Sequence, residues 1–173
     1  NEYFGGGMNS IVFQEMREAR GLAYSALGRL LEPEHKDDCY KYFAFIATQN
    51  DKMQTAIEAF DEIINDMPES ETAFSIAKES LTTQYRTERI TGRSILRSYK
   101  TDREMGINES RSKKIYENLS QLTLEDIKNT QKKWVEGRTY SYGILGDIES
   151  IDTKYLKTLG PVEILTLEDI FGY

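Results

Sequence analysis

Histidine and cysteine are almost missing from this sequence, which contains one of each, His35 and Cys39. A single cysteine excludes a disulfide within the chain and leaves the redox compartment open. A catalytic zinc ion normally needs three protein ligands and an open position for water. The residues around His35 follow no standard zinc-ligand spacing, and Cys39 has no histidine partner that would make it a nucleophile. We therefore expect a solvated turn at residues 32–38 and neither a metal centre nor a thiol active site.

Long apolar runs and excess positive charge are also missing. No apolar run reaches the roughly 18 residues that a membrane-spanning helix needs. Lys and Arg number 22 against 29 Asp and Glu, a net charge of −7, which argues against a general nucleic-acid-binding protein. We expect a soluble protein. No signal peptide is visible, and the compartment stays open between such choices as the bacterial periplasm and the cytoplasm.

The sequence has enough apolar residues for one ordinary domain. Hydrophobic residues make up 39% of its 173 residues, and aromatic residues make up 11%. No internal repeat, low-complexity segment or second domain boundary is visible. We therefore expect a single domain over residues 1–173.

The first 27 residues predict a glycine turn, an amphipathic helix and the start of a strand. Gly5–Gly7 permit a tight turn, and Ser10 can cap the helix that follows. Gly21 lies where helices often end on glycine, before a strand over residues 22–32. The apolar face of the helix comprises Val12, Phe13, Met16 and Ala19.

The remaining pattern predicts segregated strands and helices. Residues 39–49 are rich in aromatic and branched side chains and should form an antiparallel hairpin with residues 22–32. Helices are expected at residues 51–67, 70–90, 94–105, 112–119, 124–136 and 151–159, and further strands at 140–145 and 162–167. The order favours an α+β fold, a mainly antiparallel sheet with helices packed on one face.

One stretch resembles a known family. Residues 5–25 read GGGMNSIVFQEMREARGLAYS, and this pattern is similar to the core of the insulinase-like zinc metallopeptidases, which include insulinase, pitrilysin and the mitochondrial processing peptidase. The rest of the chain agrees more loosely, in its order of elements and in its ending at Leu167–Phe171. In this family, strands and a helix precede the motif, so the resemblance implies a domain that lacks its first strands. Such a sheet exposes an edge unless something covers it.

The resemblance also implies that the active site is shared between two halves of the peptidase. The zinc-bearing half of these peptidases carries an HxxEH motif with a further glutamate downstream, and a chain with one histidine cannot contain that motif. The chain therefore resembles the zinc-free C-terminal half, or part of it, which closes over the zinc-bearing half around a peptide substrate. The two halves can belong to one polypeptide or to two subunits. The family's Arg and Tyr, seven positions apart, fall here on Arg17 and Tyr24, and zinc belongs to the other half.

Other interpretations remain for several residues. Residue chemistry alone would make Arg17 a helix C-terminal cation and Tyr24 a side chain packed on the sheet. The glycines could form an anion cradle, although Asn9-Ser10 lacks the lysine of a phosphate loop. The carboxylates Glu125, Asp126, Glu168 and Asp169 fit the first turns of helices.

The basic residues and the whole chain each keep one alternative interpretation. A basic series fits a solvated helix face or, in the minority interpretation, a surface for an acidic partner or substrate. Its members are Arg86, Arg89, Arg93, Arg97, Lys100 and Arg103. The alternative for the whole chain is a non-catalytic structural subunit, similar to the core subunits of respiratory complexes.

Overall fold

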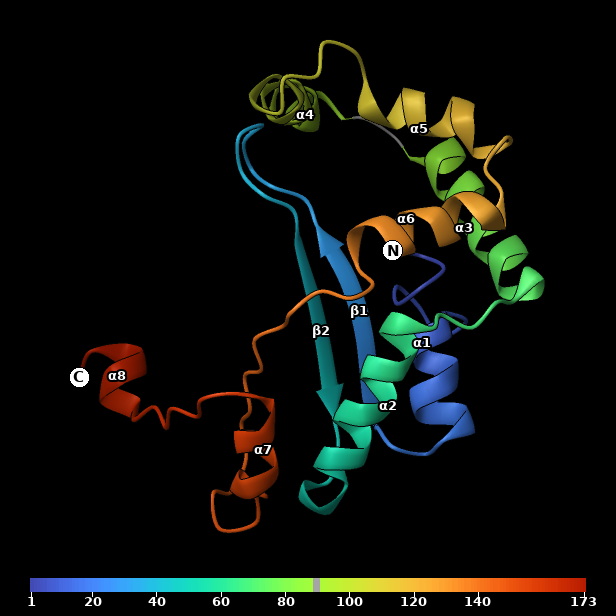
Figure 1. Ribbon diagram of the computed structural model, residues 1–173. Coiled ribbons are helices and arrows are strands. Elements are labelled where there is room, and N and C mark those ends of the chain that lie inside the picture. The colour runs from blue at the N-terminus through green and yellow to red at the C-terminus, as the bar shows by residue number, and fades with distance from the viewer. Residues whose placement is uncertain (89–90) are drawn as a thin grey trace.

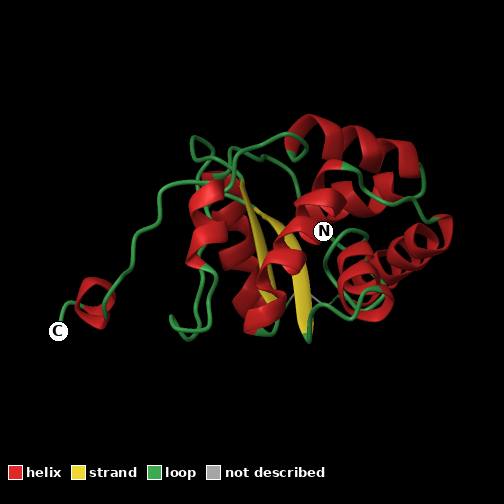
Figure 2. Cartoon of the chain, turned by 60° about the horizontal axis from the view of Figure 1, so that its bottom comes forward, coloured by secondary structure: helices red, strands yellow, loops and turns green. Residues whose placement is uncertain are grey.

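The computed structural model describes residues 1–88 and 91–173, apart from the side chain of residue 93. A central hairpin is surrounded by helices, and the C-terminal helix lies apart from the others (Figures 1 and 2). The described elements are α1 (Ile11–Phe13), the π-helix η1 (Gln14–Ala19), β1 (Ser25–Leu31), β2 (Lys41–Ala47), the 3₁₀-helix η2 (Asn50–Lys52), α2 (Met53–Asn65), α3 (Glu71–Thr87), α4 (Gly92–Glu104), α5 (Arg111–Leu119), α6 (Leu124–Trp134), α7 (Thr153–Leu159) and α8 (Leu167–Phe171).

The antiparallel hairpin predicted from the sequence is confirmed. β1 and β2 pair from Ser25 opposite Ala47 to Leu31 opposite Lys41. Tyr42 and Ile46 lie on the face that packs against the buried core, while Phe43 and Phe45 on the other face are about half exposed. The alternation follows from the two-residue period of a strand. The result is a mixed helix-and-strand fold with a two-stranded sheet, compatible with the predicted α+β class.

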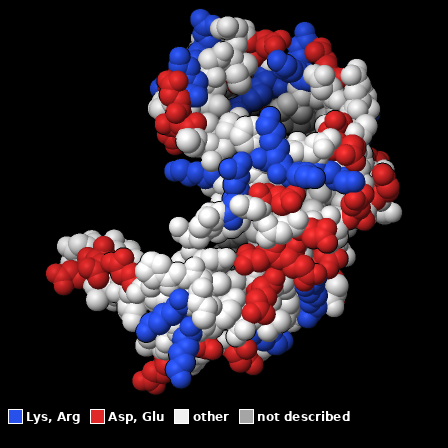
Figure 3. Space-filling model, in the orientation of Figure 1, with Lys and Arg blue, Asp and Glu red and all other residues white. Residues whose placement is uncertain are grey.

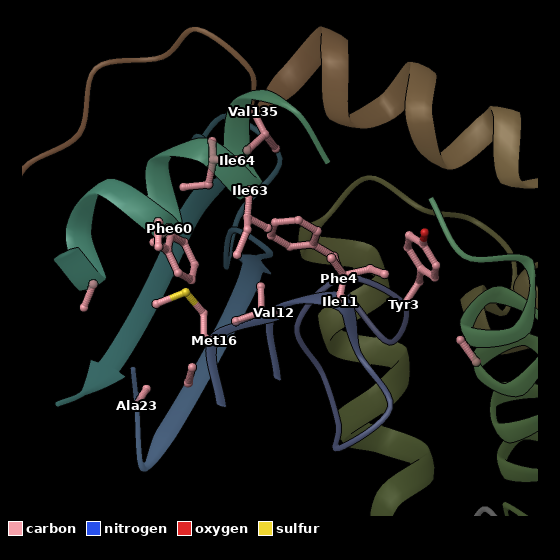
Figure 4. Packing of buried hydrophobic residues seen from close by; sticks show 14 of the residues in the cluster. Tyr3, Phe4, Ile11, Val12, Met16, Ala23, Phe60, Ile63, Ile64 and Val135 are labelled. Carbon is pink, nitrogen blue, oxygen red and sulfur yellow. The ribbon is translucent and has the colours of Figure 1, made fainter. Parts of the chain in front are cut away.

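The core lies between the hairpin, the N-terminal helical segment and α2. Val12, Met16 and Ile63 are fully buried there, and Phe60 packs beside them (Figure 4). Burying one such large apolar side chain stabilises a fold by about 1.5–3 kcal/mol. The apolar stripes predicted for the first helix and for residues 51–67 therefore face one another.

The N-terminal residues cover the outer edge of β1. The backbone N–H of Gly28 donates to the carbonyl of Gly5 at 3.4 Å. The side chain of Asn1 accepts from the N–H of Leu30 at 2.7 Å and donates to its carbonyl at 3.0 Å, as a neighbouring strand would. A Cβ on Gly5 would lie 2.3 Å from the carbonyl oxygen of Gly28, so only glycine permits this approach. Gly5 thus serves as a structural contact of the predicted glycine turn.

Several helix caps follow the predicted signals. The N–H of Ala73 donates to the Ser70 hydroxyl at 3.1 Å, which caps α3. Thr123 and Asp126 form a capping box at α6, and these hydrogen bonds hold the pKa of Asp126 below its ordinary value. Glu168 and Asp169 lie in the first turn of α8, as Glu125 does in α6.

Two strand predictions are wrong, and one helix end lies outside the described residues. Residues 140–145 and 162–166 run as irregular chain, and α8 begins at Leu167, the last residue of the second predicted strand, behind a Thr166 capping box. Among the described residues, neither segment has the backbone partner that a strand requires. The predicted helix from residue 70 is described to Thr87, and its expected end near Ile90 lies beyond the described residues.

Candidate functional site

The structure brings Arg17 and Tyr24 together on an exposed surface. The guanidinium carbon of Arg17 lies 5.5 Å from the centre of the Tyr24 ring and 5.0 Å from that of Phe13. Tyr24 is 82% exposed, and the Arg17 side chain is 44% exposed. The Arg17 side chain also approaches Glu18 at 3.6 Å, a contact that solvent weakens. Both side chains can therefore present hydrogen-bond donors outward from one place.

A π-helical turn and a left-handed glycine set this arrangement. The N–H of Arg20 donates to the carbonyl of Glu15 at 3.2 Å, one residue further than in an α-helix. Gly21, with φ of +58°, then reverses the chain, and its N–H donates to the carbonyl of Arg17 at 3.2 Å. Such π-turns are rare in proteins and occur frequently at functional sites. The predicted end of the helix at Gly21 is confirmed.

Tyr24 is fixed through its backbone, and its side chain projects into solvent. Its N–H donates to the carbonyl of Ala47 at 2.8 Å, which ties it to the end of β2. The Thr48 hydroxyl donates to the carbonyl of Leu22 at 2.6 Å, and Lys52 Nζ donates to that of Gly21 at 3.3 Å. The residues that these bonds join line an open hollow of about 400 Å³, and Tyr24 is one of them. A polypeptide backbone could approach the exposed ring from this side.

Arg20 has a different environment from Arg17, three residues away. Its guanidinium donates two hydrogen bonds to the carboxylate of Glu62 on α2, at 2.7 and 3.2 Å, and lies 3.6 Å from Glu15. The bonds from Arg20, together with its charge, hold the pKa of Glu62 below its ordinary value. Arg20 therefore fastens η1 to α2, while Arg17 remains on the surface. Sequence reasoning placed both arginines at the helix end and could not find Glu62, which lies 42 positions away.

A second hollow lies between β2 and residues 140–145. It has a volume of about 600 Å³, and α2 forms its floor. The Tyr142 hydroxyl donates to the two carboxylate oxygens of Asp61 at 3.3 and 3.2 Å. Burial, followed by the charge of Asp61, raises the pKa of Tyr142 to about 12, and burial also raises the pKa of Asp61. The sequence contained no signal for this hollow.

The hydroxyl of Tyr42, a residue that also lines this hollow, is buried. It has no hydrogen-bond partner among the described residues, and burial raises its pKa. The ring packs between Phe4 and Tyr140, with centroids 6.1 and 6.0 Å away. An unpaired buried hydroxyl is costly, so this position carries an energetic penalty that its packing has to offset.

The other sequence candidates do not assemble into a site. His35 and Cys39 lie in exposed chain between the strands. Within residues 1–88 and 91–173, no three His, Cys, Asp or Glu side chains come together in a group that could hold a metal ion. No described helix is long and apolar enough to cross a membrane.

The predicted basic series is only partly described. Arg89 and the side chain of Arg93 lie outside the described part of the chain. Lys100 pairs with Glu104 at 3.6 Å on α4, and acidic and basic side chains alternate over this end of the molecule (Figure 3). This arrangement fits the interpretation of a solvated face.

Arg17 and Tyr24 offer a guanidinium and a phenol, two hydrogen-bond donors. Such a pair can bind and polarise a carbonyl or carboxylate oxygen of another molecule. No protein-family model matches this sequence, and no curated protein sequence matches it.

Proposed function

We propose that this chain is a zinc-free C-terminal part of an insulinase-like (M16) metalloendopeptidase. It closes the substrate chamber over a zinc-bearing half, in the same polypeptide or in a separate subunit. The observation that carries the proposal is the proximity of Arg17 to Tyr24 on an exposed surface, at the spacing that the family resemblance singles out. The mixed helix-and-strand fold with an antiparallel hairpin is compatible with a domain of this kind.

The proposed chemistry assigns only oxygen recognition to this chain. In peptide hydrolysis, negative charge develops on the oxygen of the scissile carbonyl. Arg17 and Tyr24 donate hydrogen bonds to this region of the peptide and stabilise the charge. Because their environment on this chain is exposed, they become effective only when the other half closes over them and excludes water. Zinc lies on the other half in this proposal.

The test is to replace the two donors in the complete enzyme, this chain together with its zinc-bearing half. Arg17→Ala and Tyr24→Phe should each lower kcat for peptide hydrolysis by roughly a hundredfold, corresponding to about 3 kcal/mol per transition-state donor. Zinc content, measured by atomic absorption, should not change. Tyr40→Phe is the matched control, since this tyrosine is exposed at the far end of the hairpin.

Wild-type turnover in both variants would remove Arg17 and Tyr24 from the site. The proposal as a whole requires a half that carries HxxEH, encoded in the same reading frame or co-purifying as a subunit. A complex with no such half and no peptidase activity would leave the structural-subunit alternative.

A further inference from the structure

The backbone groups on the outer edge of β2 point into the hollow above α2. The N–H groups of Gly28 and Leu30 bond to the N-terminal residues, so they point away from β2. Backbone groups alternate sides along a strand, so residues 27 and 29 of β1 face β2. The register places these two opposite Phe45 and Phe43. Tyr42, Ala44 and Ile46 therefore direct their N–H and C=O groups outward, into the hollow.

These outward groups are unpaired in the described part of the chain. Within residues 1–88 and 91–173 the sheet contains only β1 and β2, and no turn or loop backbone bonds to Tyr42, Ala44 or Ile46. The three residues lie at the alternate positions at which a neighbouring strand would pair. Backbone groups repeated at this spacing fit another polypeptide backbone and match no small ligand along their whole length.

The opposite wall is an unpaired segment without regular secondary structure. Residues 140–145 line the hollow across from β2 and make no backbone–backbone hydrogen bond within the described residues. The wall is positioned by side chains: the Tyr140 hydroxyl donates to the carbonyl of Val135 at 2.7 Å, and the Tyr142 hydroxyl donates to Asp61. The open edge of β2 and this unpaired segment thus border a single hollow.

The floor decides the side-chain chemistry of an occupant. Met53, Ile57 and Phe60 of α2 line it, and Asp61, engaged by Tyr142, is the one charged residue among the lining residues. An occupant would bury apolar side chains against this floor, beside one carboxylate that already accepts from Tyr142. In an extended segment only every second side chain faces the floor.

We propose that the hollow binds one β-strand of a separate partner polypeptide, whose alternate side chains are apolar. The strand pairs with the outward N–H and C=O groups of Tyr42, Ala44 and Ile46. Its alternate apolar side chains pack on α2, and its other edge lies against residues 140–145. The occupied hollow converts the hairpin into a sheet of at least three strands. This inference does not depend on the peptidase proposal.

The first experiment measures amide hydrogen exchange with a defined probe. The probe is a synthetic peptide of alternating Thr and Val, flanked by Lys for solubility and added at saturating concentration. In the free chain the inward N–H groups of Phe43 and Phe45 should exchange slowly, whereas those of Ala44 and Ile46 should exchange fast. The peptide should slow exchange at Ala44 and Ile46 by tenfold or more. Unchanged exchange at both positions, with peptide bound, would overturn the proposal.

The second experiment removes one outward donor. Ala44→Pro deletes an N–H that faces away from β1, a position where an edge strand tolerates proline. Ala44→Gly keeps the N–H and is the matched control. Peptide affinity, measured by fluorescence anisotropy, should fall about tenfold in the proline variant and should change much less in the glycine variant. Circular dichroism checks that both variants fold.

Two further outcomes would contradict the proposal. Equal affinity in the proline and glycine variants would show that binding does not use the β2 edge. If the free chain sediments as a dimer and the Ala44 and Ile46 amides are already protected, a second copy occupies the edge instead of a separate strand.

Discussion

The two outer edges of the hairpin differ, because the β1 edge is covered and the β2 edge is open. The β1 edge is covered by Asn1 and Gly5, which supply a side-chain amide and a backbone carbonyl where a third strand would stand. The β2 edge faces a hollow of about 600 Å³ and has no backbone partner among the described residues. Both strands have the same length and pair in the same register, so the difference comes from what lies beside them.

The difference shows that edge protection depends on short, local details. The covered edge needs an asparagine side chain that can both donate and accept, and a glycine without a Cβ. The open edge has neither feature, although β2 is the more aromatic of the two strands. A strand's own composition therefore does not decide whether its edge is closed.

The largest expected effect breaks the covered edge. In Gly5→Ala, the new Cβ would lie 2.3 Å from the carbonyl oxygen of Gly28, so the N-terminal segment has to move away from β1. We expect the free energy of unfolding, measured by urea denaturation, to fall by about 1–3 kcal/mol. Gly7→Ala is the control, because the atom nearest to the new Cβ would lie 4.0 Å from it. This variant should change the free energy of unfolding by less than about 0.5 kcal/mol. Equal effects in the two variants would show that the close approach to Gly28 is unimportant.

A smaller effect is expected at the open edge. Tyr142→Phe removes the hydroxyl that donates to Asp61 and positions residues 140–145. The free energy of unfolding should fall by about 1 kcal/mol, since the carboxylate is only partly buried. Tyr40→Phe, at a position that is 57% exposed, should have no measurable effect. If the two phenylalanine variants unfold alike, the Tyr142–Asp61 bond contributes nothing to this wall.

The smallest effect concerns the pair that joins η1 to α2 on the covered side. Because Arg20 lowers the pKa of Glu62 in the folded state, the pair stabilises the fold fully above the ordinary pKa of 4.5. This contribution is lost as the pH falls through the lowered folded value. Urea unfolding at a series of pH values should show that wild type loses more stability on acidification than Glu62→Gln. Glu58→Gln, whose carboxylate accepts from Gln54, should follow wild type, and parallel curves for all three would contradict the assignment.

Sequence patterns anticipated the elements whose signals are local. The α2 stripe and the caps at Ser70 and Thr123 each depend on residues within a few positions of one another, and the hairpin joins two strands that follow one another in the chain. The strand prediction for residues 140–145 failed because alternating apolar residues indicate an extended chain but do not supply a partner. That segment is held instead by Tyr142 and Asp61, which are 81 positions apart.

The sequence likewise predicted only some features of the candidate site. The spacing of Arg17 and Tyr24 and the break at Gly21 are visible in the sequence, and the family resemblance selected those two residues. The π-turn that contains Arg17 and the separate anchoring of Arg20 by Glu62 are not visible, because both depend on tertiary packing. Whether Arg17 and Tyr24 act on a peptide stays a prediction.

The asparagine that closes the β1 edge also limits how these chains can aggregate. A fibril of stacked strands needs two free edges on every molecule, one to accept the previous copy and one to template the next. A molecule with one free edge can form a pair through β2 and then stops. Opening the β1 edge would give each molecule two free edges instead of one. By covering that edge, Asn1 and Gly5 limit pairing through strand edges to dimers and prevent polymerisation.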